Sequence, residues 1–283
     1  MIVAGSASQV LAARVAEETE RTLVEVEYEE FPDGERIVRV PGVSSDDEVA
    51  VVASTPTDAA YVELLQLLDA CSDAARVNLV LPYMGYARQD KQFEEGEPVT
   101  ARALASALPR VESVTTVNVH EPSVLDWFDA DETNDLDAMT ALADALDVDD
   151  PLILSPDEGA RELAESLADA LGGADADYLV KERLSGDEVR LHPKSLDAEG
   201  RDAVVVDDMV ATGGTMSTAV GMLREQGARS VHAACVHPVF ARNAVLRLYS
   251  AGAENVVATD TLSTALSDVS VAPLVARSLE KER

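Results

Sequence analysis

Short runs of β-branched residues alternate with helical patterns along the whole chain. In the first half, strands are expected at 1–5, 48–54, 75–82 and 111–119, and helices near 8–20, 57–74 and 100–108. In the second half, strands are expected at 151–155, 177–183, 188–192, 202–208, 230–237 and 254–260, with a helix near 158–171 and another after 215. The helix after 215 is expected to carry a stripe of apolar residues, Met216, Ala219, Val220 and Leu223. This rhythm predicts βαβ units around mainly parallel sheets, which is an α/β fold.

The length of the chain favours two domains. A chain of 283 residues is long for a single core, and 47% hydrophobic residues can fill two. The acidic stretch 129–137 interrupts the periodicity, so we place the boundary near 140–150. The predicted domains are 1–145 and 146–283, with the last helix able to pack on the N-terminal domain.

The charge of the chain restricts its partners. It has 53 acidic and 22 basic residues and a formal net charge of −31. Such a surface repels nucleic-acid backbones and anionic membranes, so neither is an expected partner. No apolar run is long enough to span a bilayer, no targeting segment is evident at the N-terminus, and Cys71 and Cys235 have no metal-binding spacing. We expect a cytoplasmic protein with two reduced core thiols.

The segment 207–215, "DDMVATGGT", lies between a buried strand and a helix, where parallel sheets bind ligands. Gly213 and Gly214 allow a tight turn that points backbone N–H groups inward, and Thr212 and Thr215 add hydroxyl donors. With the helix N-terminus, these groups predict a phosphate cradle. A solvated glycine turn is the alternative, which the ordered combination of strand, acids, loop and helix disfavours.

Asp207 and Asp208 need another role, because anions do not bind phosphate. Their carboxylates can accept hydrogen bonds from sugar hydroxyls or hold Mg²⁺ through water. The whole element resembles the ribose-phosphate loop of the type I phosphoribosyltransferase fold.

The segment 85–105 is long and polar and is flanked by glycine and proline. It reads as a mobile loop at 86–98 carrying Arg88, Gln89 and Lys91, donors that suit a loop closing over a polyphosphate. On these residues alone, an ordinary surface loop is an equal alternative.

Three further sites carry polar residues at strand ends. His120 follows a strand, as a metal ligand or as a neutral hydrogen-bonding residue. Asp157 stands where a strand gives way to a helix, and helix capping by Ser155 or Asp157 is the simpler explanation there. Lys181 and Arg183 lie two apart on one side of a strand. Two such cations in a −31 chain suggest an anionic ligand, with a surface salt bridge as the alternative.

Taken together, these segments resemble the ribose-phosphate diphosphokinase (PRPP synthase) family. The resemblance runs almost from end to end and includes "FPDGERIVRV" (31–40), "YARQDK" (86–91), "VNVH" (117–120), "SPDEGA" (155–160), "KER" (181–183), "VVDDMVATGGT" (205–215), "HPVF" (237–240) and "ATDT" (258–261). It implies two tandem type I phosphoribosyltransferase-like domains, the first of which has lost its own loop. It also implies a homo-oligomer in which the 31–35 segment of one subunit reaches its neighbour's ATP.

The same resemblance implies roles for individual residues. ATP would be bound by Phe31, Asp33, Gly34, Glu35, Arg88, Gln89 and His120, and Mg²⁺ by His120 and Asp157. Catalysis would rest on Lys181, Arg183 and Arg88. Ribose 5-phosphate would be bound by Arg183, Asp207, Asp208, Ala211, Thr212, Gly213, Gly214 and Thr215. Ala211 is a departure, because many relatives have an acid there, so no carboxylate is available at that place.

The implied reaction is ATP plus ribose 5-phosphate giving 5-phosphoribosyl 1-diphosphate (PRPP) plus AMP. A non-catalytic regulatory subunit is one alternative, but it predicts loss of the loop donors or of the Lys181–Arg183 pair, and both are present. A phosphoribosyltransferase that consumes PRPP is the other, and it offers no account of the 31–35 segment or of the 86–98 loop.

The acidic composition generates a prediction about salt. With only four lysines against 53 acids, self-repulsion should be relieved in concentrated salt, where the Debye length is roughly 3 Å at 1 M. We therefore predict a halophilic protein whose melting temperature rises from low to multimolar KCl. Melting temperatures that stay level or fall across that series would contradict the prediction.

Overall fold

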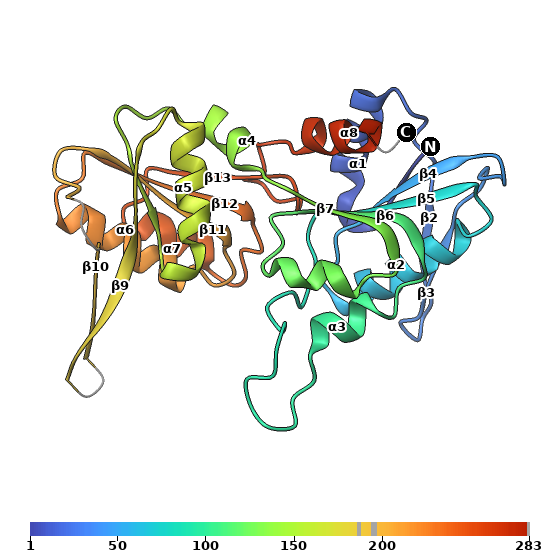
Figure 1. Cartoon of the computed structure of the whole chain (residues 1–283), viewed down its shortest axis with the longest axis horizontal. Helices are drawn as coiled ribbons and strands as arrows, with labels where there is room; N and C mark the ends of the chain where they lie inside the picture. The colour runs from blue at the N-terminus through green and yellow to red at the C-terminus, as the bar shows by residue number, and fades with distance from the viewer. Residues whose placement is uncertain (186–187, 194–196, 282–283) are drawn as a thin grey trace. The chain divides into compact units, whose positions relative to one another are not determined.

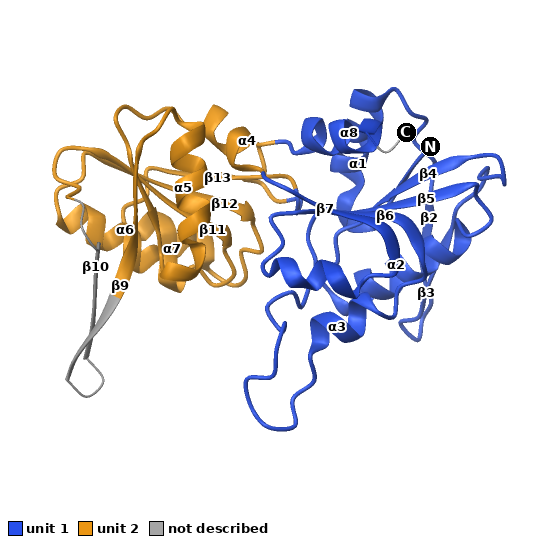
Figure 2. Cartoon of the chain, in the orientation of Figure 1, with its two compact units in different colours: residues 1–137, 261–263, 270–283 blue, residues 138–260, 264–269 orange. Residues whose placement is uncertain are grey.

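The computed structural model describes residues 1–185, 188–193 and 197–281, and it describes no side chain between 181 and 196. The chain forms two compact units, coloured separately in Figure 2. Unit 1 comprises residues 1–137, 261–263 and 270–283, and unit 2 comprises residues 138–260 and 264–269. The division at 145/146 that the sequence suggests stays a prediction about domains.

Unit 1 is built on a parallel sheet with the strand order β1-β4-β5-β6-β7 (Figure 1). Its strands are β1 (Ile2–Ala4), β4 (Glu48–Val52), β5 (Arg76–Leu81), β6 (Val111–Val117) and β7 (Ala130–Leu136). Its helices are η1 (Ser6–Ser8), α1 (Gln9–Thr19), α2 (Asp58–Ala70), α3 (Thr100–Ala105), η2 (Pro122–Trp127) and α8 (Ala272–Lys281). The strands and helices expected from the first half of the sequence are confirmed, apart from differences of a few residues at their ends.

The acidic stretch 129–137 is the main departure from expectation. Instead of interrupting the α/β pattern, most of it forms β7, which pairs in parallel with β6. β7 is last in the strand order of its sheet, so it has a strand partner on one side only. An edge strand with exposed side chains does not need the apolar run by which buried strands are recognised.

A second departure is a ribbon of β2 (Glu27–Glu30) and β3 (Arg36–Arg39), paired antiparallel. Two strands alone are marginally stable in water, and α2 supplies the missing support. The Gln66 amide donates to the Arg36 carbonyl oxygen at 2.7 Å and accepts from the Val38 backbone N–H at 3.1 Å. The Gln66 side chain thus makes hydrogen bonds to β3 of the kind that a neighbouring strand would make. Val38 is buried in the core.

Unit 2 contains a six-stranded sheet in the order β10-β9-β8-β11-β12-β13, antiparallel only between β9 and β10 among the pairs described. Its strands are β8 (Leu152–Ser155), β9 (Asp175–Ser185), β10 (Glu188–Pro193), β11 (Asp202–Met209), β12 (Ser230–His237) and β13 (Asn255–Ala258). Its helices are α4 (Met139–Asp144), η3 (Glu158–Ala160), α5 (Arg161–Ala170), α6 (Gly214–Glu225) and α7 (Ala244–Ser250). All the strands expected in this half are confirmed.

The core of unit 2 forms around β11. Residues 203–206 of this strand have no exposed surface, because β8 and β12 flank it and the sheet faces are covered. The predicted stripe on α6, Met216, Ala219, Val220 and Leu223, is buried in the same core. Cys235 and, in unit 1, Cys71 are buried free thiols, as expected. No helix in the described part of the chain is long and apolar enough to cross a membrane.

At the start of β11, Asp202 ties three segments of unit 2 together. Arg229 donates from Nε to Oδ1 and from Nη2 to Oδ2, both at 2.8 Å. Ser230 Oγ donates to Oδ1 at 2.6 Å, and the Asp149 backbone N–H donates to Oδ2 at 2.9 Å. The hydrogen bonds from Arg229 hold the pKa of Asp202 well below its usual range, so the ionised carboxylate stabilises the fold.

Replacing this carboxylate should destabilise the protein. Asp202→Ala is expected to lower the free energy of unfolding at pH 7 by about 2–3 kcal/mol, because it removes charge-assisted hydrogen bonds at a buried position. The folded-state pKa lies below the unfolded value of about 3.9, so the contribution is full at neutral pH and disappears as the pH falls through the folded pKa.

Urea titrations at fixed KCl would measure both effects. Asp149→Ala is the matched control, because that carboxylate is 92% exposed and should contribute less than about 1 kcal/mol. Equal losses from the two substitutions would contradict the role of Asp202.

Candidate functional site

The segment between β11 and α6 forms a tight loop held by backbone contacts. Gly213 has a φ of +71°, which favours glycine, and a Cβ there would lie 3.1 Å from the Ala244 carbonyl oxygen. On its other side, the loop is fixed by hydrogen bonds from Phe240 N to Val210 O and from Ala241 N to Ala211 O, both at 2.8 Å. The predicted loop is therefore held by close backbone contacts on both sides.

The loop presents donor groups at the start of a helix. α6 has 12 residues, and its N-cap is Gly213, so no side chain caps the N–H groups of its first turn. Thr212 and Thr215, on either side of the two glycines, are exposed. N–H groups of a helix N-terminus together with two hydroxyls are a favourable seat for a phosphate.

An unpredicted cation lies beside this loop. Arg247 of α7 is exposed, and its Nη1 is 3.7 Å from the place that a Cβ on Gly214 would occupy. Sequence reasoning missed Arg247 because it follows the loop by more than 30 residues and belongs to no motif. Only the packing of α7 against the loop brings it there.

The acids at the end of β11 repel one another. Asp207 and Asp208 are partly buried. Loss of solvent raises the pKa of Asp207 well above its ordinary value, and the charges of Asp208 and then Asp157 raise it further. The structure thus brings three of the predicted site residues, from the ends of β8 and β11, into one electrostatic cluster.

Asp157 also has the structural role considered for it. Its Oδ1 accepts from the Gly159 N–H at 2.9 Å and from the Ala160 N–H at 3.4 Å, so it caps η3 at the start of the helical segment. Ser155 Oγ donates to the Asp157 carbonyl oxygen at 2.7 Å. The cap uses only Oδ1, and the negative charge of Asp157 still acts on Asp207.

For Lys181 and Arg183, the cationic pair predicted on β9, the structure describes the backbone but not the side chains. Lys181 pairs with Leu191 and Arg183 with Val189 in the β9–β10 ladder. Their side chains lie outside the part of the chain that the structure describes, so their predicted contacts stay a prediction.

In unit 1, residues 31–35, which are predicted to bind ATP, form the turn of the β2–β3 ribbon. Gly34 has a φ of +90°, and the turn is closed by hydrogen bonds from Phe31 N to Glu35 O and from Gly34 N to Phe31 O, both at 2.8 Å. Asp33 Oδ1 accepts from the Glu35 N–H at 3.2 Å. Phe31 is 38% exposed, so the ribbon offers an aromatic face to solvent.

The segment 82–99, which contains the predicted mobile loop, has no helix or strand. Arg88 is exposed, and Lys91 lies over the Phe93 ring at 5.5 Å from its centroid. Gln89 is attached to the start of α3, because its Oε1 accepts from Thr100 Oγ1 at 2.6 Å. The loop therefore has a fixed end near Gln89 and an exposed remainder.

His120 follows the carboxyl end of β6 and is exposed. No group of three or more His, Cys, Asp or Glu side chains suited to a metal ion occurs within residues 1–180 and 197–281, whose side chains are described. The predicted metal ligands His120 and Asp157 belong to units 1 and 2 respectively. Their joint use stays a prediction.

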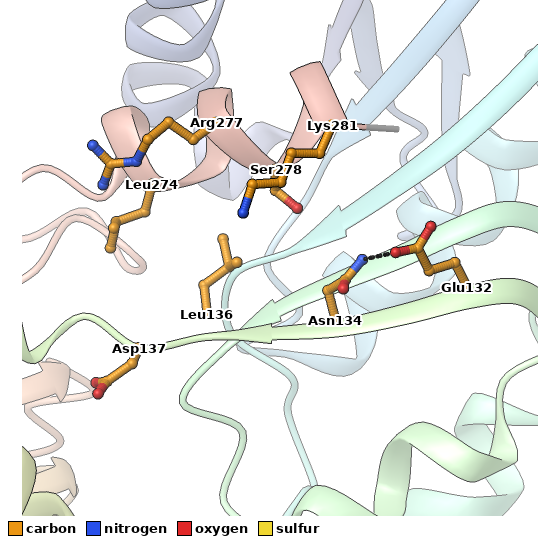
Figure 3. A pocket seen from close by; sticks show the side chains of 8 residues that line it. All are labelled: Glu132, Asn134, Leu136, Asp137, Leu274, Arg277, Ser278 and Lys281. Carbon is orange, nitrogen blue, oxygen red and sulfur yellow. Dashed lines mark hydrogen bonds between the residues drawn. The ribbon is translucent and has the colours of Figure 1, made fainter. Parts of the chain in front are cut away.

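A pocket of about 240 Å³ lies elsewhere in unit 1, between β7 and α8 (Figure 3). It is lined by Glu132, Asn134, Leu136, Asp137, Leu274, Arg277, Ser278 and Lys281. Among the predicted site residues whose side chains the structure describes, none lines this pocket.

Two protein families match the chain. Residues 1–111 match the N-terminal domain of ribose phosphate pyrophosphokinase, and residues 132–261 match the phosphoribosyl transferase domain. These matches confirm the expected fold of two phosphoribosyltransferase-like domains with mainly parallel sheets.

Individual relatives are similar over their full lengths. The chain is 48% identical to a ribose-phosphate pyrophosphokinase of Methanosarcina acetivorans, covering 99% of both chains. It is also 48% identical to one of Halobacterium salinarum, covering 99% of this chain and all of the relative. The crystal structure of phosphoribosylpyrophosphate synthetase from Mycobacterium smegmatis superimposes with a TM-score of 0.86 at 31% identity, covering 99% of this chain and 97% of that one. The chain therefore belongs to the ribose-phosphate pyrophosphokinase family.

Proposed function

We propose that this protein is a ribose-phosphate diphosphokinase, which makes PRPP and AMP from ATP and ribose 5-phosphate. The observation that carries the proposal is the full-length similarity to ribose-phosphate pyrophosphokinases, which spans both domains in one chain. In the reaction, the 1-hydroxyl of the ribose attacks the β-phosphorus of ATP in line. The bond between the β-phosphorus and the oxygen that bridges it to the α-phosphorus breaks, and AMP leaves with that oxygen.

Ribose 5-phosphate binds at the loop between β11 and α6. The N–H groups of residues 211–215, with the Thr212 and Thr215 hydroxyls, hold the 5-phosphate, supported by the rigid turn at Gly213. Asp207 and Asp208 accept hydrogen bonds from the ribose hydroxyls. The phosphate seat thus fixes the end of the sugar that does not react.

ATP binds at residues of unit 1. The exposed turn of the β2–β3 ribbon, with Phe31, Asp33, Gly34 and Glu35, contacts the adenine of a neighbouring subunit, and Arg88 and Gln89 contact the nucleotide from the loop. The exposure of Phe31 supports this, because an aromatic ring held on a supported ribbon suits stacking on a base. This arrangement requires a homo-oligomer.

The cofactor that we propose for this reaction is Mg²⁺. Carboxylate oxygens are its preferred ligands, and the cluster of Asp157, Asp207 and Asp208 carries like charges that a cation would neutralise. His120 and Asp157 would hold the ion. When bound, the ion would neutralise negative charge on the diphosphoryl group that is transferred.

The remaining charge is neutralised by side-chain cations. Phosphoryl transfer depends mainly on positioning and on stabilising charge over the equatorial oxygens, for which Lys181, Arg183 and Arg88 are suited. The competing functions are a non-catalytic subunit and a phosphoribosyltransferase that consumes PRPP. An assay for AMP release, followed by an incubation with added PRPP and a base, distinguishes all three.

That assay combines the pure protein with Mg²⁺, ATP and ribose 5-phosphate in KCl. We expect AMP to appear only with the sugar and in equal amount to PRPP. A regulatory subunit would release no AMP, and a consuming enzyme would remove added PRPP when given a base.

In the Lys181→Ala variant, turnover should fall by a factor of about 1,000, on the order of 4 kcal/mol, because a cation that stabilises the transition state is lost. Near-normal turnover there would remove Lys181 from the mechanism.

Asp207→Asn should separate binding from stability. We expect weaker binding of ribose 5-phosphate by isothermal titration and a gain of about 1 kcal/mol in the stability of the ligand-free protein at pH 8. The sign follows from the raised pKa of Asp207: the folded state holds this proton more tightly than the unfolded state, so the ionised group destabilises the fold above its folded pKa.

The stability gain should therefore disappear as the pH falls toward the ordinary carboxyl pKa of about 4. Asp268→Asn is the charge-matched control, since Asp268 is exposed in unit 2 and should change neither quantity. Unchanged affinity for the sugar in Asp207→Asn would contradict the assigned contact.

A further inference from the structure

The chain turns sharply just before His120. β6 ends at Val117, and only Asn118 and Val119 separate it from His120. Asn118 has a φ of +39°, close to the left-handed region that asparagine tolerates better than most residues. Its N–H donates to the Leu136 carbonyl oxygen of β7 at 3.0 Å. The turn therefore relies on the neighbouring strand for support.

One carboxylate of β7 holds both ends of this turn. The Val119 N–H donates to Asp135 Oδ1 at 3.0 Å and to Oδ2 at 3.2 Å. Thr116 Oγ1, still within β6, donates to the same Oδ1 at 2.7 Å. Asp135 thus connects the end of β6 to the residue that directly precedes His120.

Asp135 is not a core residue. Along β7, Glu132, Asn134 and Leu136 line the pocket beside α8 (Figure 3), while Asp135 belongs to the alternate set and is the cross-strand partner of Thr116. The residue as a whole is exposed on the edge strand, although its carboxylate is partly shielded from solvent, which raises its pKa. Removing the side chain therefore opens no cavity in the core. The hydrogen bonds of its carboxylate run to Thr116 at the end of β6 and to Val119 in the turn.

Resting on the proposed function, we propose that Asp135 is a positioning residue, which fixes the place of the His120 imidazole through the backbone of Val119. Only one peptide bond separates the clamped N–H group from the His120 backbone, so a loosened Val119 moves the imidazole directly. Phosphoryl transfer is sensitive to such movement, since a shift of about 1 Å can lower a rate by about 100-fold.

Steady-state kinetics of the full-length protein provide the first test. In Asp135→Ala, kcat/KM for ATP should fall at least about tenfold and the Mg²⁺ concentration for half-maximal rate should rise, with KM for ribose 5-phosphate unchanged within twofold. Asp131→Ala is the matched control, because it removes an acid from the same strand, and Asp131 pairs with Arg110. Equal effects of the two substitutions would overturn the proposal.

A double-mutant cycle tests whether Asp135 acts through His120. In a His120→Ala background, adding Asp135→Ala should change kcat/KM for ATP by less than about twofold, because the positioned group is already gone. The same tenfold loss in both backgrounds would show a separate, general role and would overturn the proposal.

A measurement without substrates separates this proposal from the proposed function. Hydrogen exchange of the Val119 amide should be at least about tenfold faster in Asp135→Ala than in Asp131→Ala, and intermediate in Asp135→Asn, which keeps one acceptor oxygen. Unchanged exchange would overturn the clamp even if the enzyme is active. If the wild-type protein releases no AMP while exchange responds as expected, the proposed function fails and the clamp on the His120 turn stands.

Discussion

Burial of β11 in the middle of the unit 2 sheet is the constraint on which the site depends. A strand covered on both faces has polar residues only at its ends, and β11 follows this pattern, with Asp202 at its start and Asp207 and Asp208 near its end. The end of β8 carries Asp157 to the same edge, since adjacent parallel strands finish together. The acids and the phosphate loop are therefore brought together by strand order.

The cluster of Asp157, Asp207 and Asp208 destabilises the ligand-free fold, and the proposed binding of the sugar would explain why these acids are present. Asp207 loses solvent and lies near two further carboxylates, so its ionised form destabilises the ligand-free fold. At the other end of the same strand, the Asp202 carboxylate is stabilised by Arg229. One strand thus carries a stabilising carboxylate at its first residue and a destabilising one at its sixth. Such a contrast is typical of a strand whose second end serves ligands rather than folding.

Local sequence patterns predicted much of this fold, but they did not predict contacts between residues that are far apart in the sequence. The valines before Asp207 and the stripe on α6 depend only on neighbouring residues, so periodicity identified them. The ribbon held by Gln66 depends on residues about 30 positions away, and β7 is polar because it lies at an edge. Arg247 reaches the loop through packing of α7. No spacing in the sequence encodes such contacts, so hydrophobic patterning misses them.

Two strand ends that carry proposed site residues are held by different kinds of contact. The loop after β11 is fixed by backbone packing, in which a Cβ on Gly213 would come within 3.1 Å of the Ala244 carbonyl oxygen. The turn after β6 is fixed by a side chain, since the Asp135 carboxylate accepts from Val119. Close backbone packing suits the proposed binding of the 5-phosphate, which takes no part in the bond changes of the proposed reaction. A carboxylate on an edge strand can be altered without opening the core, so under the proposed positioning role substitutions of Asp135 would change the place of His120 more than the fold.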